Sequence, residues 1–451
     1  MNDLRGQNVL VMGLKRSGLS AIRLLASAGA RVTGTDIDPA LEVPEQFPGE
    51  HRVVLRLGKH DPEDFLHADL IVVSPGVPTA HPLLNQARNR GVPVIGELEL
   101  ASRFLGQEVV YGITGTNGKS TTTELLAEIV RRSGKRVFAG GNLGTPVSDA
   151  IVNAPEKGWE ALVLEISSFQ LETIESFRPH VGVILNITPD HAERHEGSLA
   201  YAEAKFALFR NQLPSDYALL NRDDEEIRRY RPKMVSKQVW FSQQDKEFSS
   251  FRIENGELLY QPGGKPIRIA DLKSAQLTGS HNRENILAAA AMAFLTGISP
   301  ECIQTGIDAF RGLAHRMEKV RELRGVTYID DSKATNIGAV LRSLESTAAP
   351  VVLIAGGREK GGGFGPLRAF VKEKVKALIL IGESKERFKS DLEGATRIEF
   401  AISLEDAVRK ASRVAGNGDT VLLSPACSSF DMFRDYAERG NRFKKAVLEL
   451  G

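Results

Sequence analysis

The feature that most constrains this chain is a strand, a glycine-rich turn and a helix in immediate succession. Residues 109–114 form an apolar run typical of a buried strand, and residues 115–118 form a Gly/Thr/Asn turn. Lys119 and Ser120 then open a segment with a helical apolar pattern. Glycines let backbone N–H groups approach a phosphate, and a helix N-terminus adds positive potential. The order predicts an ATP site, although Ile113 takes the place of the usual pattern's first glycine.

Length and composition favour a cytoplasmic protein of several domains. At 451 residues the chain is too long for a single core, and roughly three domains are expected. A formal charge of +1 predicts no general attraction to nucleic acid or to a membrane surface. Cys302 and Cys427 are too few for a disulfide framework, and the first residues lack the apolar core of a signal peptide. No apolar run approaches the ~20 residues that span a bilayer.

The first hundred residues predict a Rossmann-like unit that binds something other than NAD. Strands are expected at 8–12 and 31–35 with a helix at 19–28 between them, and Asp36 ends the second strand. Lys15 replaces the middle glycine of the dinucleotide fingerprint, the one that lets pyrophosphate approach the backbone. The helix N-terminus remains and neighbouring side chains add donors, which favours another diphosphate.

Later strands also end in polar residues, at the sheet edge where α/β folds bind ligands. A strand at 70–73 leads into Ser74-Pro75-Gly76, although an ordinary turn explains that sequence equally well. A strand at 161–164 ends in Glu165, and an acidic residue downstream of a P-loop can ligate the Mg²⁺ of a nucleotide. Strands separated by helices predict a mostly parallel sheet, and small edge strands are expected at 239–269.

Several polar residues of the middle third have more than one interpretation. His191 and His195 are four apart, but the third ligand and the glutamate order of a zinc protease are missing, which favours His191 as a partner of Mg²⁺ or substrate. Lys205 lies on a helix among small and apolar neighbours, where a snorkelling lysine is the ordinary outcome. Asn282 and Asn285 on the first turn of an alanine-rich helix suit adenine recognition, although N-capping explains the first equally well.

The last third repeats the α/β arrangement. Strands are expected at 326–330, 351–355, 377–381 and 420–423, and each is followed by small or polar residues. A third sheet with a ligand-binding edge is therefore predicted. Cys427 lies in one of these loops without an obvious base nearby, which favours a buried filler over a nucleophile.

Seven motifs together resemble those of the Mur ligases of bacterial cell-wall synthesis, nearly end to end. Four are shared across the wider family, which includes folylpolyglutamate synthases: GTNGKST at 115–121, GNLG at 141–144, EISSFQL at 165–171 and NITPDH at 186–191. The others are HRME at 315–318, DSKATN at 331–336 and SPACSS at 424–429. The last two, with the Gly13-Leu14 unit, are similar to the D-glutamate-adding branch of the family.

The resemblance implies an α/β fold of three domains: a Rossmann-like N-terminal domain, a central P-loop mononucleotide-binding sheet with small extra strands, and a Rossmann-like C-terminal domain. The expected spans are 1–100 for UDP-sugar binding, 101–313 for ATP binding and 314–451 for amino-acid binding. The implied activity is an ATP-dependent ligation of D-glutamate to UDP-N-acetylmuramoyl-L-alanine through an acyl phosphate. Two Mg²⁺ sites, a monomer and no nucleic-acid partner are implied as well.

The resemblance also assigns roles residue by residue. It implies catalytic roles for Lys119, His191 and Lys205, and metal binding by Ser120, Glu165, His191 and a carbamylated Lys205. The implied ATP contacts are Gly115, Thr116, Asn117, Gly118, Lys119, Ser120, Thr121, Asn282, Asn285, Arg316 and Asp331. The implied UDP-sugar contacts are Gly13, Leu14, Lys15, Arg16, Ser17, Asp36, Ser74, Pro75, Gly76, Asn142 and His191. The implied D-glutamate contacts are Thr335, Lys360, Ser429, Phe430 and Tyr436, the last in place of the family's phenylalanine.

Three alternatives remain open at the level of sequence. A sister ligase that adds a diamino acid would differ in the pocket around Lys360 and Ser429. A dehydrogenase built on the first strand–helix–strand unit is disfavoured by Lys15. A nucleotide switch without catalysis would bind ATP whether or not Lys205 is present.

Overall fold

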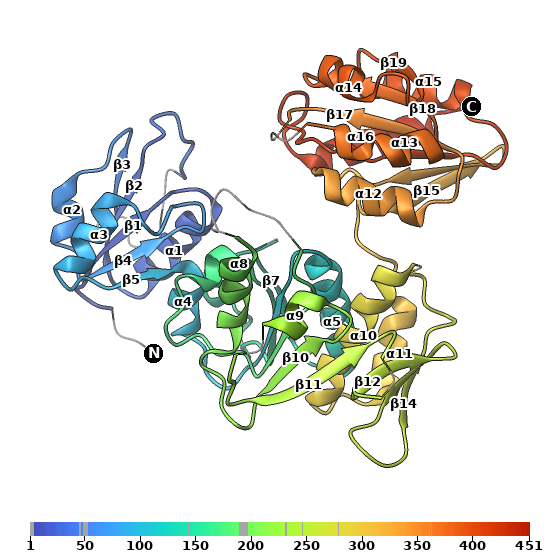
Figure 1. Ribbon diagram of the computed structural model, residues 1–451. Helices are drawn as coiled ribbons and strands as arrows, with labels where there is room; N and C mark the ends of the chain where they lie inside the picture. Colours follow the sequence, from blue (N-terminus) through green and yellow to red (C-terminus); the bar gives the residue numbers. More distant parts are fainter. Residues whose placement is uncertain are drawn as a thin grey trace. The chain divides into compact units, whose positions relative to one another are not determined.

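The computed structural model of the protein contains two compact units, Met1–Arg311 and Gly312–Gly451. It describes residues 4–44, 47, 53–142, 144–188, 197–230, 232–245, 247–277, 279–359, 361 and 363–451. The first unit holds two sheets and the second holds one, each with helices on its faces (Figure 1). The predicted α/β class with three sheets is confirmed. Every helix in the described part of the chain is too short, too polar or too charged to span a bilayer.

The first sheet has five parallel strands in the order β3-β2-β1-β4-β5. The strands are Asn8–Met12 (β1), Arg31–Asp36 (β2), Val53–Leu57 (β3), Leu70–Val73 (β4) and Val94–Gly96 (β5). The helices are Arg16–Ser27 (α1), Pro62–Leu66 (α2), Pro82–Asn89 (α3) and Glu97–Ser102 (α4). Strand order reverses between β1 and β4, so their carboxyl ends form the edge where such sheets bind ligands.

Helix α1 begins at Arg16, earlier than the predicted start at Leu19. Its first turn lies directly against the loop after β1, where a Cβ on Gly18 would overlap the carbonyl oxygen of Gly13. This close approach requires glycine at position 18. Apolar periodicity does not detect the turn because it contains no large apolar residue.

The second sheet has nine strands in the order β14-β13-β12-β11-β10-β9-β6-β8-β7, parallel except at the β12–β13–β14 edge. The strands are Val109–Thr114 (β6), Val137–Gly141 (β7), Ala161–Glu165 (β8), Val181–Ile184 (β9), Tyr217–Asn221 (β10), Lys237–Ser242 (β11), Phe251–Glu254 (β12), Glu257–Tyr260 (β13) and Ile267–Asp271 (β14). The helical segments are Lys119–Arg132 (α5), Val147–Val152 (α6), Ser168–Leu171 (α7), Gly197–Phe206 (α8), Ala207–Phe209 (η2), Glu225–Arg229 (α9), Ser280–Leu295 (α10) and Pro300–Ala309 (α11). The small strands predicted at 239–269 are thus the edge of this sheet.

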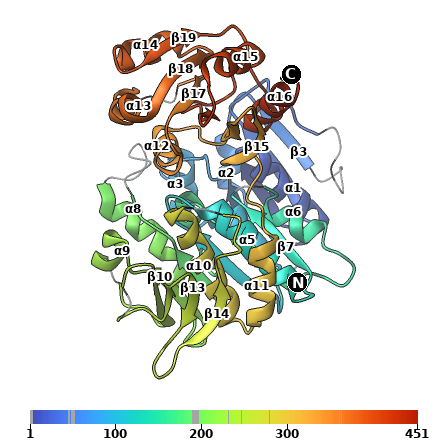
Figure 2. The ribbon, with the colours of Figure 1, turned by 90° about the vertical axis from the view of Figure 1, so that its right-hand side faces the viewer.

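Helices α5, α10 and α11 pack against one another on one face of the second sheet (Figure 2). The predicted apolar face of α5, made of Leu125, Leu126, Ile129 and Val130, is fully buried there. Burial of each such side chain stabilises the fold by about 1.5–3 kcal/mol. Gly306 of α11 lies against the backbone of Ile129, where a Cβ would not fit.

Polar contacts join the two sheets of the first unit. Arg23 donates two hydrogen bonds of 2.8 Å to the Asp149 carboxylate. Glu97 accepts the Ser148 amide at 2.6 Å, and Glu99 accepts three consecutive backbone amides from the segment after α7. Both glutamates are buried, so loss of these donors would leave an unpaired buried carboxylate.

The sheet of the second unit has the order β15-β16-β20-β17-β18-β19 and is parallel except for β15. The strands are Glu318–Leu323 (β15), Val326–Asp330 (β16), Val351–Gly356 (β17), Val375–Ile381 (β18), Arg397–Phe400 (β19) and Thr420–Leu423 (β20). The helical segments are Ile337–Ser346 (α12), Gly365–Leu367 (η3), Arg368–Lys374 (α13), Lys385–Leu392 (α14), Leu404–Val414 (α15) and Tyr436–Leu448 (α16). Helices α15 and α16 share one hydrophobic core, and α12, α13 and α14 share the other.

Candidate active site

The glycine turn after β6 lies at the carboxyl edge of the second sheet, between the ends of β8 and β9. Gly115 and Gly118 have φ values of +149° and +84°, which favour glycine. Helix α5 begins directly after Gly118, and no side chain of the described residues caps it. Its first N–H groups and positive end can therefore receive phosphate oxygens.

Lys119 and Asn186 hold this phosphate turn in shape. Lys119 Nζ donates to the carbonyl oxygens of Gly115 at 2.8 Å and Thr116 at 3.0 Å. Asn186 accepts the amide of Asn117 at 2.8 Å and donates to its carbonyl at 3.2 Å. A triphosphate would offer the lysine charged acceptors in place of two neutral carbonyls, which makes stronger hydrogen bonds.

Helix α10 brings two asparagines to the phosphate turn. Asn285 Oδ1 accepts from Thr122 Oγ1 at 3.3 Å, and its Nδ2 lies 3.5 Å from Asn282 Oδ1. A Cβ on Gly118 would overlap Asn285 Oδ1. N-capping by Asn282 is wrong as an explanation, because α10 begins earlier, at Ser280.

The end of β8 supplies the carboxylate expected for Mg²⁺. Glu165 is buried, and its Oε1 accepts from Asn142 Nδ2 at 3.0 Å. Its Oε2 is also buried and has no hydrogen-bond partner among the described residues. Ser120, on the first turn of α5, is buried as well. An unpartnered carboxylate oxygen and a buried hydroxyl are oxygen ligands of the type that Mg²⁺ prefers, so these two described residues fit the ion.

Lys205 lies near the end of α8 and is only 1% exposed. Its Nζ is 4.2 Å from the centre of the Tyr201 ring. The snorkelling alternative is wrong, because a snorkelling lysine keeps its ammonium in water. His191 and His195 lie outside the described residues.

Glu284 is a further acidic group at this site, one that the sequence does not single out. Its Oε1 lies 3.5 Å from Asn186 Nδ2, the amide that also holds the phosphate turn. Burial raises the pKa of Glu284 to about 7; hydrogen bonds oppose the rise, and the charges of Asp223 and Asp224 add to it. Glu284 is the fifth residue of α10 and is half-buried, because the segments after β9 and β10 pack beside it.

The ligand edge of the first sheet is organised around Asp36. Asp36 Oδ2 accepts the Leu14 amide at 2.7 Å, and Oδ1 accepts the Asp38 amide at 3.0 Å. Ser74 Oγ donates to the Gly13 carbonyl at 2.6 Å. The loops after β1, β2 and β4 are thereby brought together, as predicted. The side chain of Leu14 is buried in the core, so only its backbone can face a ligand.

The other predicted UDP-sugar contacts have different settings. Lys15 and Arg16 are exposed at the start of α1, and Ser17 is half-buried beside them. Pro75 and Gly76 continue the turn after Ser74. Asn142 directly follows β7 of the second sheet and donates to Glu165.

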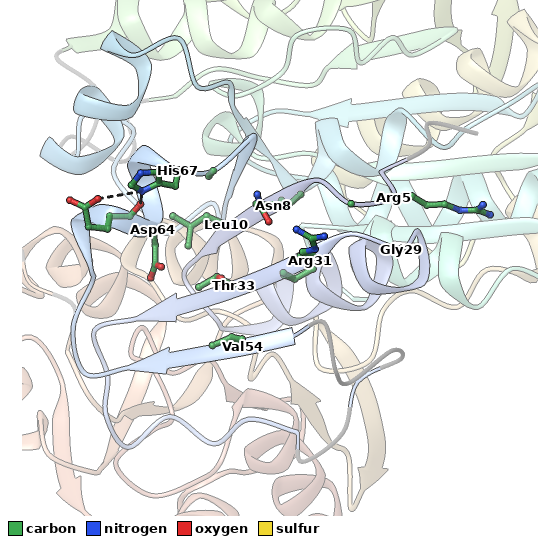
Figure 3. Close-up of a pocket in the computed structure, with 14 residues that line it drawn as sticks. Arg5, Asn8, Leu10, Gly29, Arg31, Thr33, Val54, Asp64 and His67 are labelled. Atoms are coloured by element: carbon green, nitrogen blue, oxygen red, sulfur yellow. Dashed lines mark hydrogen bonds and ion pairs between the residues drawn. The ribbon is translucent and has the colours of Figure 1, made fainter.

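A cavity of about 870 Å³ lies elsewhere on the first sheet (Figure 3). Asn8 and Arg31 line it at the starts of β1 and β2, and Asp64 and His67 line it from the region of α2. Asp36 ends β2 and is therefore at the opposite end of the strands. The loop geometry, and not this cavity, marks the candidate ligand edge.

In the second unit, Asp331 follows β16 and is buried. Its Oδ2 accepts from Ser343 Oγ at 2.5 Å and Ser424 Oγ at 2.8 Å. Burial raises the pKa of Asp331 to about 6, although these hydrogen bonds and the charge of Arg316 lower it. The structure thus brings together two of the predicted ATP contacts of this unit.

The described residues predicted to contact D-glutamate come from two loops and one helix. Thr335 lies in the loop after β16, Ser429 and Phe430 lie in the loop after β20, and Tyr436 begins α16. Strands β16 and β20 pair in parallel, so the two loops leave neighbouring strand ends. Ser429 is buried and Phe430 is 65% exposed. Lys360 lies outside the described residues.

Two reactive-looking groups of the second unit are structural. Cys427 is buried with its Sγ 3.3 Å from Ser384 Oγ, and burial raises its pKa to about 11, which confirms the filler prediction. His315, Glu318 and Asp330 gather donors of metal type. His315 Nδ1 pairs with Asp330 at 2.7 Å, while Glu318 Oε2 accepts the His315 amide at 2.9 Å, so the cluster is internally bonded.

Three family models match the chain in order. They are described as the Mur ligase MurD-like N-terminal domain at residues 7–96, the Mur ligase middle domain at 113–293 and the Mur ligase glutamate ligase domain at 315–427. The predicted family resemblance is therefore confirmed.

Curated relatives match over the full length. The UDP-N-acetylmuramoylalanine–D-glutamate ligase of Geotalea daltonii is 45% identical, covering 99% of this chain and 98% of the relative. The protein of the same name from Koribacter versatilis is 40% identical with the same coverages.

Solved structures share the fold. A UDP-N-acetylmuramate-alanine ligase from Thermotoga maritima has a TM-score of 0.59 at 19% identity, covering 98% of this chain and 99% of that one. A MurF ligase from the same organism, in complex with ADP, has a TM-score of 0.60 at 17% identity, with coverages of 99% and 96%. With three matching domains and full-length relatives, this chain belongs to the Mur ligase family.

Proposed function

We propose that this protein is an ATP-dependent ligase that joins D-glutamate to UDP-N-acetylmuramoyl-L-alanine in the synthesis of peptidoglycan precursors. The observation that carries the proposal is full-length similarity, at 40–45% identity, to relatives named for that reaction. The phosphate turn after β6 and the buried carboxylate of Glu165 support the use of ATP. The same relatives disfavour the diamino-acid ligase, the dehydrogenase and the nucleotide switch.

The proposed chemistry solves a leaving-group problem. A free carboxylate would have to expel oxide, whereas an acyl phosphate expels phosphate. ATP transfers its γ-phosphoryl group to the terminal carboxylate of UDP-N-acetylmuramoyl-L-alanine and leaves as ADP. The D-glutamate amine then attacks the acyl carbon, loses a proton, and the tetrahedral intermediate releases phosphate. Such transfers depend mainly on positioning and charge neutralisation.

The second sheet is proposed to serve the phosphoryl transfer. Lys119 exchanges its carbonyl contacts for the outer phosphate oxygens, and the N-terminus of α5 receives the remaining oxygens. Ser120 and Glu165 are proposed to hold one Mg²⁺; His191 and a carbamylated Lys205 are proposed to hold a second. When bound, Mg²⁺ neutralises charge on the phosphate oxygens.

The remaining ligands are assigned by region. Residues 1–100 are proposed to bind the UDP-sugar around Asp36, residues 101–313 to bind ATP, and residues 314–451 to bind D-glutamate. We also propose a monomer that acts in the cytoplasm. The free Cys302 and Cys427 fit a reducing compartment.

Release of ADP by the purified protein tests the proposal. ADP should form only when UDP-N-acetylmuramoyl-L-alanine, D-glutamate and Mg²⁺ are all present. L-glutamate and meso-diaminopimelate, offered in place of D-glutamate, should give background release. Background release with the complete mixture would refute the proposal, and preference for the diamino acid would establish the sister activity.

A Lys205→Ala variant separates ligase from switch. The ligase proposal predicts unchanged ATP affinity with turnover lowered by about 10²-fold or more, because a group needed only for the chemical step is lost. ATP affinity is measured by titration calorimetry and turnover by ADP release. Full turnover in the variant would remove Lys205 from the mechanism.

A further inference from the structure

Arg439, at the start of α16, is a buried cation at the ligand edge of the second unit. It is 0% exposed and is the bulkiest of the fully buried side chains in the described part of the chain. Burial lowers the pKa of Arg439 to about 10, so the guanidinium remains charged at neutral pH. A buried charge destabilises a fold unless hydrogen bonds satisfy it, so a structural reason for this residue is expected.

The guanidinium joins three segments of chain. Its Nε and Nη2 donate to the hydroxyl and the carbonyl of Ser332, at 2.9 Å and 2.8 Å, in the loop after β16. Its Nη1 donates to the Cys427 carbonyl at 3.2 Å, in the loop after β20. Ser332 Oγ in turn donates to the Tyr436 carbonyl at 2.8 Å, which adds the first residue of α16. These three segments carry the proposed D-glutamate contacts that lie within the described residues: Thr335, Ser429, Phe430 and Tyr436.

Within the described residues, the groups that accept hydrogen bonds from Arg439 are neutral: one hydroxyl and two carbonyl oxygens. Asp431 and Asp330 act on the guanidinium through space and not through a hydrogen bond in that part of the chain. Gly357 lies beside the guanidinium, and a Cβ at that position would be 3.4 Å from Nη1. Because these two carboxylates partly offset the charge through space, the contacts of Arg439 support a role in holding the loops together.

The neighbouring ATP contact is held by different groups. Asp331 precedes Ser332, yet its carboxylate is fixed by Ser343 and Ser424. Its amide donates to the Leu423 carbonyl at 2.8 Å. A change at Arg439 therefore leaves the bonds of Asp331 in place.

We infer that Arg439 is a positioning residue for D-glutamate, which fixes the Ser332–Thr335 loop and the Cys427–Phe430 loop at the spacing the amino acid requires. The inference rests on the proposed function. It adds a specificity device to the pocket without any contact between Arg439 and the substrate.

An Arg439→Lys variant tests the inference, because an ammonium keeps the charge but cannot span both loops as the planar fork does. We expect the KM for D-glutamate to rise about 10-fold or more, since small misplacements of positioning groups have effects of this size. The KM values for ATP and UDP-N-acetylmuramoyl-L-alanine should stay within about 2-fold of wild type, because Asp331 keeps its own bonds. Arg442→Lys is the matched control, because Arg442 lies one turn later on α16 and donates to Glu405 at 2.9 Å and 2.7 Å.

A D-glutamate KM unchanged in Arg439→Lys, or an equal rise in all three KM values, overturns the inference. If that variant does not fold, Ser332→Ala decides, because it removes only the hydroxyl that links Nε to Tyr436. It should raise the D-glutamate KM by about 2–5-fold with the other two unchanged, and no change, or an equal change in all three, overturns the inference. Wild-type protein is assayed in parallel, so that failure of the inference can be told from failure of the proposed function. If wild-type protein releases no ADP in response to D-glutamate, the proposed function itself is refuted.

Discussion

Two turns of the first unit share a backbone design but differ in electrostatics. Gly13 after β1 and Gly118 after β6 have φ values of +86° and +84°, and each precedes a helix that no described side chain caps. In the first turn the Asp36 carboxylate accepts the loop amide of Leu14 at 2.7 Å. In the second, the Lys119 ammonium folds back onto loop carbonyls at 2.8 Å and 3.0 Å.

The difference shows which part of a phosphate site the fold supplies. A parallel strand, a glycine and a helix N-terminus provide oriented N–H groups in both turns. The side chain bonded to the loop differs in charge: a carboxylate in the first turn, beside the exposed Lys15 and Arg16, and an ammonium in the second. Only the second is suited to the concentrated charge of a triphosphate, whereas the first offers a carboxylate acceptor to N–H or O–H groups.

The largest effect is expected from Lys119→Ala. Loss of the only full charge placed on the outer phosphates by the turn should lower turnover by about 10²–10⁴-fold in the ADP-release assay. Lys135→Ala is the control, because Lys135 follows α5, is partly exposed and is not among the proposed ligand contacts. It should change turnover by less than about 3-fold. An equal loss of turnover in Lys119→Ala and in the control variant would contradict the assignment of Lys119 to the phosphates.

Glu284→Gln should give the next largest effect, on stability. The pKa of Glu284 is about 7 in the folded chain against an ordinary value of 4.5, so between these values the folded state binds more protons than the unfolded state. Stability is then lost as pH rises through this window, by up to about 3 kcal/mol from a difference of roughly 2.5 pKa units. Asp223 and Asp224 face the group and reinforce the effect.

Replacing the titrating carboxyl of Glu284 by an amide should abolish this loss of stability with rising pH. Urea unfolding at pH 8 should show Glu284→Gln as more stable than wild type, while the two proteins should agree near pH 4. Glu301→Gln, at an exposed position of α11, is the control and should follow wild type at both pH values. A wild-type stability that does not fall between pH 5 and pH 8 relative to the variant would contradict the expectation.

The sequence predicts most of what sets up these turns. Apolar runs locate β1, β4, β6, β8 and β20, because buried parallel strands are nearly continuous in apolar residues. Strands β3, β5 and β19 are not located, because they are short or half-exposed and lack the continuous apolar run of a buried strand.

The sequence does not predict which charged side chains the fold shields from solvent. Glu165 and Asp36 are predictable because each ends an apolar strand. Glu284 is half-buried near the start of α10, and Arg439 is fully buried near the start of α16. Contacts with segments far apart in the chain shield both charges from solvent. A sequence pattern records the local neighbours of a residue, and these two residues are defined by distant ones.

Alanine at Gly13 or at Gly118 tests whether the two turns bind their ligands independently. Gly118→Ala forces a residue with Cβ into positive φ and against Asn285 Oδ1, and Gly13→Ala does the same against Val77 Cγ2 at 2.9 Å. Each should destabilise its turn by about 1–2 kcal/mol. The KM for ATP should rise in Gly118→Ala alone, and the KM for UDP-N-acetylmuramoyl-L-alanine in Gly13→Ala alone. A crossed or shared effect would show that the turns are not independent sites.

The smallest effect is expected from Asp36→Asn, which keeps the shape of the side chain and removes its charge. One oxygen can still accept the Leu14 amide, but the new NH₂ group then faces the Asp38 amide, another donor. Since a charge-assisted hydrogen bond becomes a neutral one, the KM for UDP-N-acetylmuramoyl-L-alanine should rise about 3–5-fold while the KM for ATP stays constant. Asp38→Asn is the control: Asp38 is exposed and accepts only a local amide, that of Ala40 at 3.0 Å, among its described contacts. A rise in the ATP KM of Asp36→Asn would mean that the negative charge of the first turn also acts on the second, and the two turns would then have to be treated as one electrostatic site.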